Sequence, residues 1–268
     1  MYTNNKTIPQ TLHDSPEFKQ LLVTLLTDYA KLKKNHVDMI TSPENMKKFE
    51  IAFTHPTFDS QNNYEFYEFI GDLTVNKSIV WYLQRRFPSL RNEKGVETFS
   101  QLKANLVSRK SLSSLAIKLD FWQFVRMTVE IQERNKIKVM EDIFEAFMGC
   151  LESVVDETIS IHAGYGVCYT IISKILDKMK ISFEKDQLKD SKTRLKEIFD
   201  GSKNLNGLKY KVVQPRTEEN FIFKIHVVAI FNGRETVMGE GTAAIKKQGE
   251  KIAAQNAINW LKNRRIIE

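Results

Sequence analysis

The stretch EFYEFIGD, residues 65–72, places three carboxylates among apolar and aromatic residues. On a helix, Glu65, Glu68 and Asp72 fall at i, i+3 and i+7, so they share one face. The like charges of Glu68 and Asp72, four residues apart, destabilise a helix by about 0.2–0.5 kcal/mol. No Lys or Arg stands between them and Lys77 to offset this repulsion. Either another segment brings cations to this face, or a metal ion does.

A second acidic set stands in KVMEDIFEAFMGC, where Asp142 and Glu145 are three residues apart among core-type residues. Two helices that each carry carboxylates beside an apolar face can meet and form a cluster of oxygen ligands. Such ligands suit Mg²⁺ or Mn²⁺, which bind substrate phosphates and support hydrolysis at phosphorus. Either acidic pair, taken singly, is more often a solvated helix face, and that alternative stays open.

Helices must position these acids. Apolar residues recur at helical spacing from Pro16 onward with no convincing strand, so residues 1–185 are predicted to form an all-α domain. Gly71 and Gly149 lie inside two of these patterns, where a glycine costs about 1 kcal/mol relative to alanine and usually has a packing or functional reason. The predicted helices, after one that starts at Pro16, cover residues 44–54, 64–86, 99–118, 138–155 and 165–179.

The pattern changes in the charged segment SFEKDQLKDSK, where residues 186–189 are a predicted linker. A short helix follows in KTRLKEIFDG, then the strand-like runs KYKVVQP, FIFKIHVVAIF and TVMGEGTA, then the helix KKQGEKIAAQNAINWLKNRR. Asn232-Gly233, between the last two runs, is a strong hairpin signal. Residues 190–268 are therefore predicted to form a small α+β domain of order α-β-β-β-α.

The net charge of +7 is concentrated in that second domain. Residues 190–268 carry 15 of the 40 Lys and Arg residues but only 9 of the 33 Asp and Glu residues. A basic domain suggests a polyanion such as nucleic acid, and a solvated Lys-rich surface is the alternative. Only two cysteines are present, and neither a secretory signal nor a membrane-length apolar run is found. These features predict an intracellular, cytoplasmic protein with no membrane partner.

Four ordered motifs over residues 45–160 resemble those of the ribonuclease III family. EFYEFIGD is similar to the family signature E-R-L-E-F-L-G-D, and AFTHPTF is similar to the T-H-x-S-type strip before it. FSQLKANLVSRKSLSSLAIKL and EDIFEAFMGCL resemble the two later motifs, the second being D-x-x-E-A-x-x-G. DSKTRLKEIF and KKQGEKIAAQNAINWL resemble the first and last helices of the double-stranded RNA-binding domain that commonly follows this nuclease.

The resemblance implies a Mg²⁺-dependent endoribonuclease, with Mn²⁺ able to substitute, that hydrolyses double-stranded RNA. Its products would carry 5′-phosphate and 3′-hydroxyl ends with short 3′ overhangs. The matching metal-binding and catalytic acids are Glu68, Asp72, Asp142 and Glu145, and Glu65 matches the leading signature acid that supports the site.

The resemblance also implies a homodimer, in which Phe69 matches the aromatic residue that inserts into the partner subunit. An auxiliary acid matches Glu93, or Asn92 by ungapped counting, and another falls near Glu130. The implied RNA-binding residues are Lys192, Thr193, Glu197, Lys246, Lys247 and Lys251.

Some positions depart from the family pattern. Phe66 and Tyr67 replace the usual Arg and Leu of the signature, and QPRTEENFIF replaces the G-P-x-H loop of the binding domain. An alternative function on the same fold is a catalytically inactive protein that sequesters duplex RNA or scaffolds RNA processing. Such a homologue would be expected to lose at least one of the four matching acids, and all four are present, which favours the enzyme.

Overall fold

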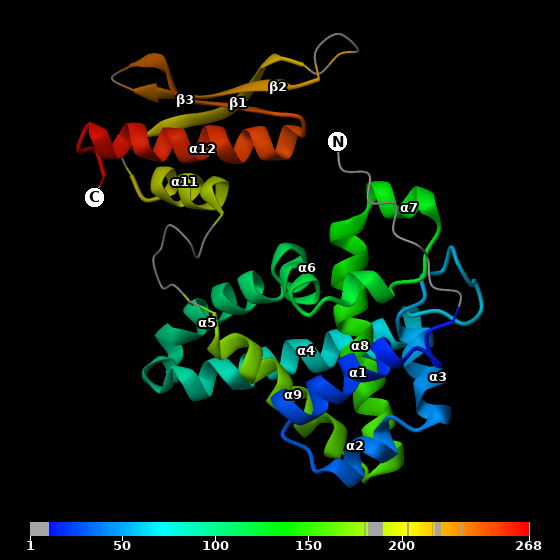
Figure 1. Ribbon diagram of the computed structural model, residues 1–268. Coiled ribbons are helices and arrows are strands. Elements are labelled where there is room, and N and C mark those ends of the chain that lie inside the picture. Colours follow the sequence, from blue (N-terminus) through cyan, green and yellow to red (C-terminus); the bar gives the residue numbers. More distant parts are fainter. Residues whose placement is uncertain are drawn as a thin grey trace. The chain divides into compact units, whose positions relative to one another are not determined.

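The computed structural model describes residues 11–179, 181, 190–202, 204–215, 217, 221–231 and 233–267 (Figure 1). The chain divides into two compact units, Met1–Ile181 and Ser182–Glu268. The predicted linker at residues 186–189 lies outside the described residues.

The first unit is built from helices, as the apolar spacing predicts. Its elements are α1 (Pro16–Thr24), η1 (Leu25–Tyr29), α2 (Lys34–Ile40), α3 (Pro43–Ala52), α4 (Glu65–Arg86), η2 (Pro88–Leu90), α5 (Glu93–Leu106), α6 (Arg109–Lys118), η3 (Phe121–Phe124), α7 (Val129–Arg134), α8 (Lys136–Thr158) and α9 (Ala163–Asp177). Among its described residues, the one extended pairing outside these helices is an isolated parallel bridge between Thr54 and Arg126. None of the described helices is long and apolar enough to cross a membrane.

The prediction of a single helix over residues 99–118 is wrong. Helix α5 ends at Leu106, and α6 begins at Arg109. The Ser108 hydroxyl accepts a hydrogen bond from the backbone N–H of Ser111, so Ser108 is an N-cap that starts a new helix inside a continuous apolar period. The short helices α2 and α7 were not predicted, because neither is long enough to show a clear period.

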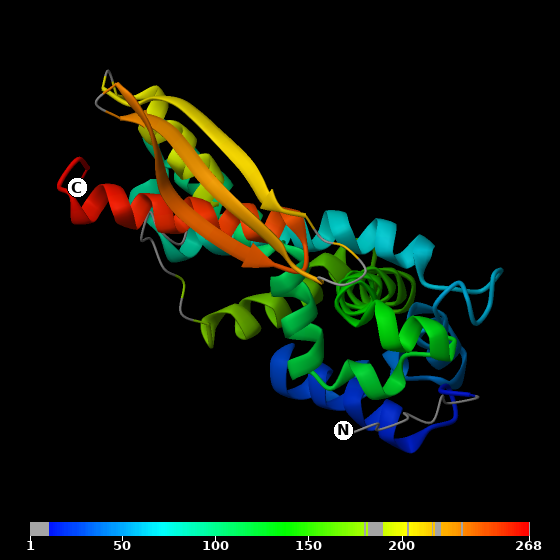
Figure 2. The same ribbon diagram turned by 90° about the horizontal axis from the view of Figure 1, so that it is seen from above.

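Helix α8 runs through the first unit, seen along its side in Figure 1 and nearly end-on in Figure 2. Most of its residues from Val139 to Val155 are buried. The ring of Phe147 packs 5.0 Å from that of Phe121, and Phe53 packs 5.2 Å from Phe121. Because protein interiors are close-packed, this surrounding fixes α8 and the acids that it carries.

The second unit is a three-stranded antiparallel sheet with both helices on one face (Figures 1 and 2). Its elements are α11 (Ser191–Asp200), β1 (Asn206–Gln214), β2 (Phe223–Phe231), β3 (Arg234–Ala243) and α12 (Lys246–Asn263). The order α-β-β-β-α is as predicted. Phe231 pairs with Arg234 across a turn in which Gly233 has a φ of +77°, and Asn232 lies outside the described residues.

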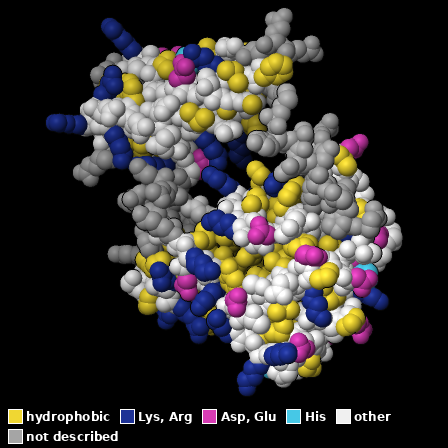
Figure 3. Space-filling view, viewed as in Figure 1, with side chains coloured by type: hydrophobic (Ala, Val, Ile, Leu, Met, Phe, Trp, Pro, Cys, Tyr) yellow, Lys and Arg dark blue, Asp and Glu magenta, His cyan; other side chains and the backbone are white. Residues whose placement is uncertain are grey.

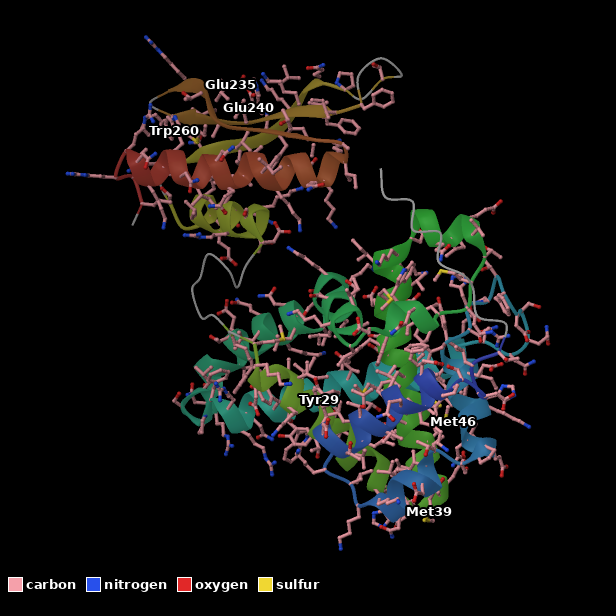
Figure 4. All side chains as sticks on the ribbon, viewed as in Figure 1. Tyr29, Met39, Met46, Glu235, Glu240 and Trp260 are labelled. Carbon is pink, nitrogen blue, oxygen red and sulfur yellow. The ribbon has the colours of Figure 1, made fainter. Side chains whose placement is uncertain are left out.

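The two faces of this sheet differ in character. Leu195, Ile225 and Ala254 are among the buried residues of the core between the sheet and its helices. Trp260 of α12, labelled in Figure 4, packs edge-on against Phe231. On β3, Glu240, also labelled in Figure 4, forms an ion pair with Lys224 at 3.0 Å. This face therefore carries charges of both signs.

Candidate active site

Helices α4 and α8 cross at two glycines. A Cβ atom built on Gly71 would collide with the backbone carbonyl of Glu145. A Cβ atom built on Gly149 would collide with the carbonyl of Tyr67 and lie 2.7 Å from the backbone nitrogen of Gly71. The missing side chains let the two backbones approach closely. The close crossing explains why glycine stands at both positions, and it brings the acids of α4 next to those of α8.

The acids line one cleft with a volume of about 770 Å³. All five predicted acids belong to its lining: Glu65, Glu68, Asp72, Asp142 and Glu145. The other lining residues are Tyr64, Phe69, Asn76, Val107, Arg109, Lys138 and Glu141. Two segments far apart in the sequence therefore face the same space, as the prediction of meeting acidic helices requires.

Burial makes this cluster electrostatically strained. Asp142 is 4% exposed and Glu145 is 9% exposed. Burial raises the pKa of Glu145 to about 8, with a further contribution from the charge of Asp72. Burial and the charge of Asp142 raise the pKa of Glu68 to about 7. Burial also raises the pKa of Asp142, although a hydrogen bond from Tyr64 opposes the rise. A cation among these carboxylates would relieve the strain, because an opposite charge favours their ionised form.

The donor set fits a hard divalent cation. Four carboxylates, those of Glu68, Asp72, Asp142 and Glu145, face one cleft, and carboxylate oxygens are the ligands that Mg²⁺ and Mn²⁺ prefer. In the described part of the chain, no three His, Cys, Asp or Glu side chains are gathered at the spacing of a formed metal site. The fit therefore rests on the chemistry of the four donors and on their common cleft.

Several cleft residues were missed by sequence reasoning. The Tyr64 hydroxyl donates a hydrogen bond of 2.9 Å to Asp142 Oδ2, and Asn76 Nδ2 donates one of 2.7 Å to Asp72 Oδ1. Lys138 lies one helical turn before Asp142 on α8, and this i, i+4 spacing could have identified it. Arg109 has no such signal, because α6 brings it to the cleft from another part of the chain.

Phe69 lies where the cleft meets an apolar stripe on α4. It lines the cleft, and its side chain is 69% exposed. Phe66, Leu73 and Val80 follow the same side of the helix and are 68%, 61% and 45% exposed. Contiguous apolar surface of this kind commonly marks an interaction site on a soluble protein.

The residues considered as auxiliary acids lie elsewhere. Glu93 is the first residue of α5 and Glu130 belongs to α7, and both are exposed. Neither lines the cleft. Asn92 is the N-cap of α5, because its side chain accepts a hydrogen bond of 2.9 Å from the backbone N–H of Gly95. Its position is thus explained by helix capping.

In the second unit, the structure brings together the starts of α11 and α12. Lys192 pairs with Glu250, and Lys251 pairs with Asp190 at 2.7 Å. The Lys192 ammonium also lies 4.9 Å from the centre of the Tyr210 ring. These two predicted RNA-binding lysines therefore join the helices of the unit to one another.

The other predicted RNA-binding residues are exposed, as Lys251 is, whereas Lys192 is half-buried. Lys246 and Lys247 are exposed at the first positions of α12, and Thr193 and Glu197 are exposed on α11. The space-filling view shows Lys and Arg side chains extending from the surface of this unit (Figure 3). Lys246 and Lys247 therefore place two exposed cations at the start of α12.

Comparison with known proteins matches the same segment. The Ribonuclease III domain model matches residues 65–153, which contain both acidic helical segments. A protein named "Putative ribonuclease 3" from Invertebrate iridescent virus 6 is 30% identical over 258 residues, which cover 91% of this chain and 87% of that protein. The chain belongs to the ribonuclease III family. As a member of the ribonuclease III family it is an endoribonuclease, a hydrolase.

Two further relatives extend the comparison. A "Putative ribonuclease 3" from Frog virus 3 (isolate Goorha) is 37% identical over 213 residues, covering 79% of this chain and 55% of that protein. The "Ribonuclease 3" of Ligilactobacillus salivarius (strain UCC118) is 27% identical over 226 residues, covering 80% of this chain and 90% of that protein. The relatives of this chain thus include both viral and bacterial proteins.

Proposed function

We propose that this ribonuclease III is a Mg²⁺-dependent endonuclease that cuts double-stranded RNA, with Mn²⁺ able to substitute. The observation that carries the proposal is that Glu68 and Asp72 on α4 face the same cleft as Asp142 and Glu145 on α8. All four acids are present, which favours a catalyst over an inactive RNA-binding protein. The products would carry 5′-phosphate and 3′-hydroxyl ends.

The four carboxylates would hold the ion, which when bound supplies Lewis-acid activation of water and of the scissile phosphate. The chain's own residues prepare the site. Asn76 holds the Asp72 carboxylate through a hydrogen bond of 2.7 Å. Lys138 adds positive charge to an otherwise acidic cleft and would attract the RNA backbone to it. Arg109 is ion-paired with Glu141 and would contact RNA only by exchanging that pair.

We propose a homodimer for the first unit. The supporting observation is the exposed stripe of Phe66, Phe69, Leu73 and Val80 along α4. A second copy covering this stripe would place two clefts in one particle, and Phe69 would contact the partner subunit. Each cleft would then cut one strand of a duplex, leaving short 3′ overhangs.

We propose that residues 190–268, within the second unit, form a double-stranded RNA-binding domain, and that residues 1–185 form the nuclease domain. Lys246 and Lys247 are exposed at the start of α12, where backbone N–H groups and the helix dipole also favour a phosphate. Thr193 and Glu197 on α11 would face the adjacent minor groove, since duplex RNA is recognised largely through 2′-hydroxyl and phosphate contacts. Lys192 and Lys251 would contact RNA only by exchanging their ion pairs.

A cleavage assay on matched substrates tests the proposal. The full chain is incubated with an end-labelled RNA duplex, with either of its strands alone, and with a DNA duplex of the same sequence, in Mg²⁺ and in EDTA. The expected result is cutting of the RNA duplex alone and only with the metal, with 5′-phosphates on the products. An RNA duplex left intact in both Mg²⁺ and Mn²⁺, or a single strand cut equally well, refutes the proposed substrate and cofactor.

Sedimentation analysis tests the dimer separately. Wild type is expected to sediment as a dimer, and Phe69→Ser is expected to shift the population toward monomer. A wild-type protein that stays monomeric at the concentrations of the cleavage assay contradicts the two-cleft arrangement.

A further inference from the structure

Tyr64, the residue directly before α4, reaches into the acidic cleft from a buried position. Its side chain is 3% exposed, and its hydroxyl donates a hydrogen bond of 2.9 Å to Asp142 Oδ2. Asp142 is itself 4% exposed and lies on α8. A buried hydrogen bond to a charged oxygen is among the stronger ones in a protein and fixes the direction of both groups.

The ring of Tyr64 is held from several sides. Its backbone N–H donates to the carbonyl of Thr54 at 2.9 Å, and its own carbonyl accepts the N–H of Glu68 at 2.8 Å, which starts helix α4. The ring lies edge-on to that of His55, with the centroids 5.5 Å apart and the planes at 83°. The hydroxyl therefore projects from a fixed point beside the acids.

The strip that carries Thr54 and His55 is anchored by Arg126. The backbone N–H of His55 donates to the carbonyl of Arg126, and that of Arg126 donates to the carbonyl of Phe53, each at 2.8 Å. The Arg126 guanidinium forms an ion pair with Glu50 at 2.7 Å. The segment THPT, residues 54–57, therefore has a structural role, since its Thr54 and His55 contact Tyr64 and hold it in place.

Asp142 needs such a holder because its neighbours repel it. Glu68 and Glu145 line the same cleft, and like charges would turn a carboxylate on a flexible χ2 angle away from them. Among the described residues, the Asp142 carboxylate accepts a single side-chain hydrogen bond, which comes from Tyr64 and reaches Oδ2. Oδ1 is therefore the oxygen left available for a cation.

We propose that Tyr64 is a positioning residue, which holds the Asp142 carboxylate in the orientation that binds a divalent cation in the cleft. This inference rests on the proposed function of the four acids as a metal site. Tyr64 acts through Asp142 and not on the RNA. Partners of this kind, which orient a metal ligand, typically change metal affinity by about 10–100-fold when they are removed.

Mn²⁺ titration of the full chain without RNA, followed by electron paramagnetic resonance, tests this role. Tyr64→Phe removes one hydroxyl and keeps the ring, and it is expected to weaken Mn²⁺ binding by about tenfold or more. Tyr82→Phe is the matched control. Tyr82 lies on α4, is 5% exposed, and donates a hydrogen bond of 3.0 Å to Asp177 Oδ1, away from the cleft. This control is expected to bind Mn²⁺ as wild type does.

Cleavage at varied Mg²⁺ gives a second measurement. The Mg²⁺ concentration for half-maximal rate is expected to rise in Tyr64→Phe by the same factor as the Mn²⁺ dissociation constant. The rate at saturating Mg²⁺ is expected to recover toward that of wild type. A far-UV spectrum checks the fold, and Tyr64→Met, which fills the space without a donor, replaces Tyr64→Phe if that variant is unfolded.

A double-mutant cycle identifies the group through which Tyr64 acts. In an Asp142→Asn background, Tyr64→Phe is expected to cause no further loss of Mn²⁺ affinity. A full additional loss there, equal Mn²⁺ affinity of Tyr64→Phe and wild type, or an equal loss in Tyr82→Phe would each overturn the inference. A wild-type protein that binds no Mn²⁺ would instead refute the proposed metal site, so the two failures are distinguishable.

Discussion

Replacing Glu145 by glutamine is expected to stabilise the protein in the absence of metal. Folding raises the pKa of Glu145 from 4.5 to about 8, chiefly through burial. At pH 7 the folded protein must therefore either hold a proton or bury a charge that the unfolded chain exposes to water. Between the unfolded-state pKa of 4.5 and pH 7, each pH unit costs the folded state about 1.4 kcal/mol. At pH 7 the folded protein is therefore destabilised by about 3 kcal/mol.

The glutamine removes that charge but leaves a buried amide. Incomplete hydrogen bonding of such a group costs about 1–2 kcal/mol, which leaves a net gain of about 1–2 kcal/mol. For a unit of this size the gain corresponds to a rise in Tm of roughly 2–8 °C. Because the pKa is raised on folding, the stability associated with Glu145 is fully present below pH 4.5 and falls as the pH rises toward 8. The advantage of Glu145→Gln must therefore grow with pH.

Thermal unfolding in EDTA between pH 5 and pH 8, followed by circular dichroism, measures this dependence. Glu97→Gln is the matched control, because Glu97 is an exposed acid on α5 outside the cleft. The difference in Tm between Glu145→Gln and wild type is expected to be small at pH 5 and largest at pH 8, while the control follows wild type. A variant that melts at or below wild type at pH 8, or a difference that is constant with pH, would refute the electrostatic reasoning.

Three further perturbations give distinct readouts. Gly71→Ala is expected to abolish Mn²⁺ binding and to lower Tm, because the added methyl group collides with the backbone of α8; unchanged binding by titration contradicts the crossing. Replacing Lys246 and Lys247 together by alanine is expected to weaken duplex RNA binding and to reduce the slope of log affinity against log salt by about two, measured by filter binding; an unchanged slope shows that other residues bind phosphate. Glu50→Gln is expected to destabilise the protein by about 1–3 kcal/mol at pH 7. Burial alone would raise the pKa of Glu50, but hydrogen bonds from two backbone N–H groups and a histidine, with an arginine nearby, hold it below the usual value. That stability is present above pH 4.5 and is lost as the pH falls through the lowered folded-state pKa, so urea unfolding of variant and wild type should converge as the pH falls below 4.5; a constant difference contradicts the assignment.

The helical first unit and the small antiparallel sheet could be predicted from the sequence, because period, caps and turn residues act locally. The pairing of acids could also be anticipated. Glu68 and Asp72 lie on one face of a helix whatever surrounds it. Gly71 and Gly149 indicate that another backbone segment approaches each helix closely. The crossing of α4 and α8 then follows from the glycines, since a side chain at either position would separate the helices.

Other features could not be predicted from the apolar period alone. The cap at Ser108 divides an apolar period that continues through both helices, so the period alone predicts one helix. The hydrogen bond from Tyr64 to Asp142 joins residues that only the tertiary fold brings together. The resemblance implies RNA contacts for Lys192 and Lys251, and the structure adds that acids on neighbouring elements pair with both side chains. The cap at Ser108 acts over three residues, whereas the contacts of Tyr64, Lys192 and Lys251 join residues distant in the chain.

The central claim is that four carboxylates from two crossing helices form one metal-dependent catalytic site. Single-turnover cleavage of an RNA duplex in Mg²⁺ tests it most directly, with Glu68→Gln, Asp72→Asn, Asp142→Asn and Glu145→Gln each compared with wild type and with Glu97→Gln. Each of the four variants is expected to slow cleavage by at least about 100-fold, because each removes a ligand of the ion that activates water and phosphate. Glu97→Gln is expected to cut as wild type does. Any one of the four variants that cuts within a few-fold of wild type at the same Mg²⁺ concentration would contradict the four-carboxylate site.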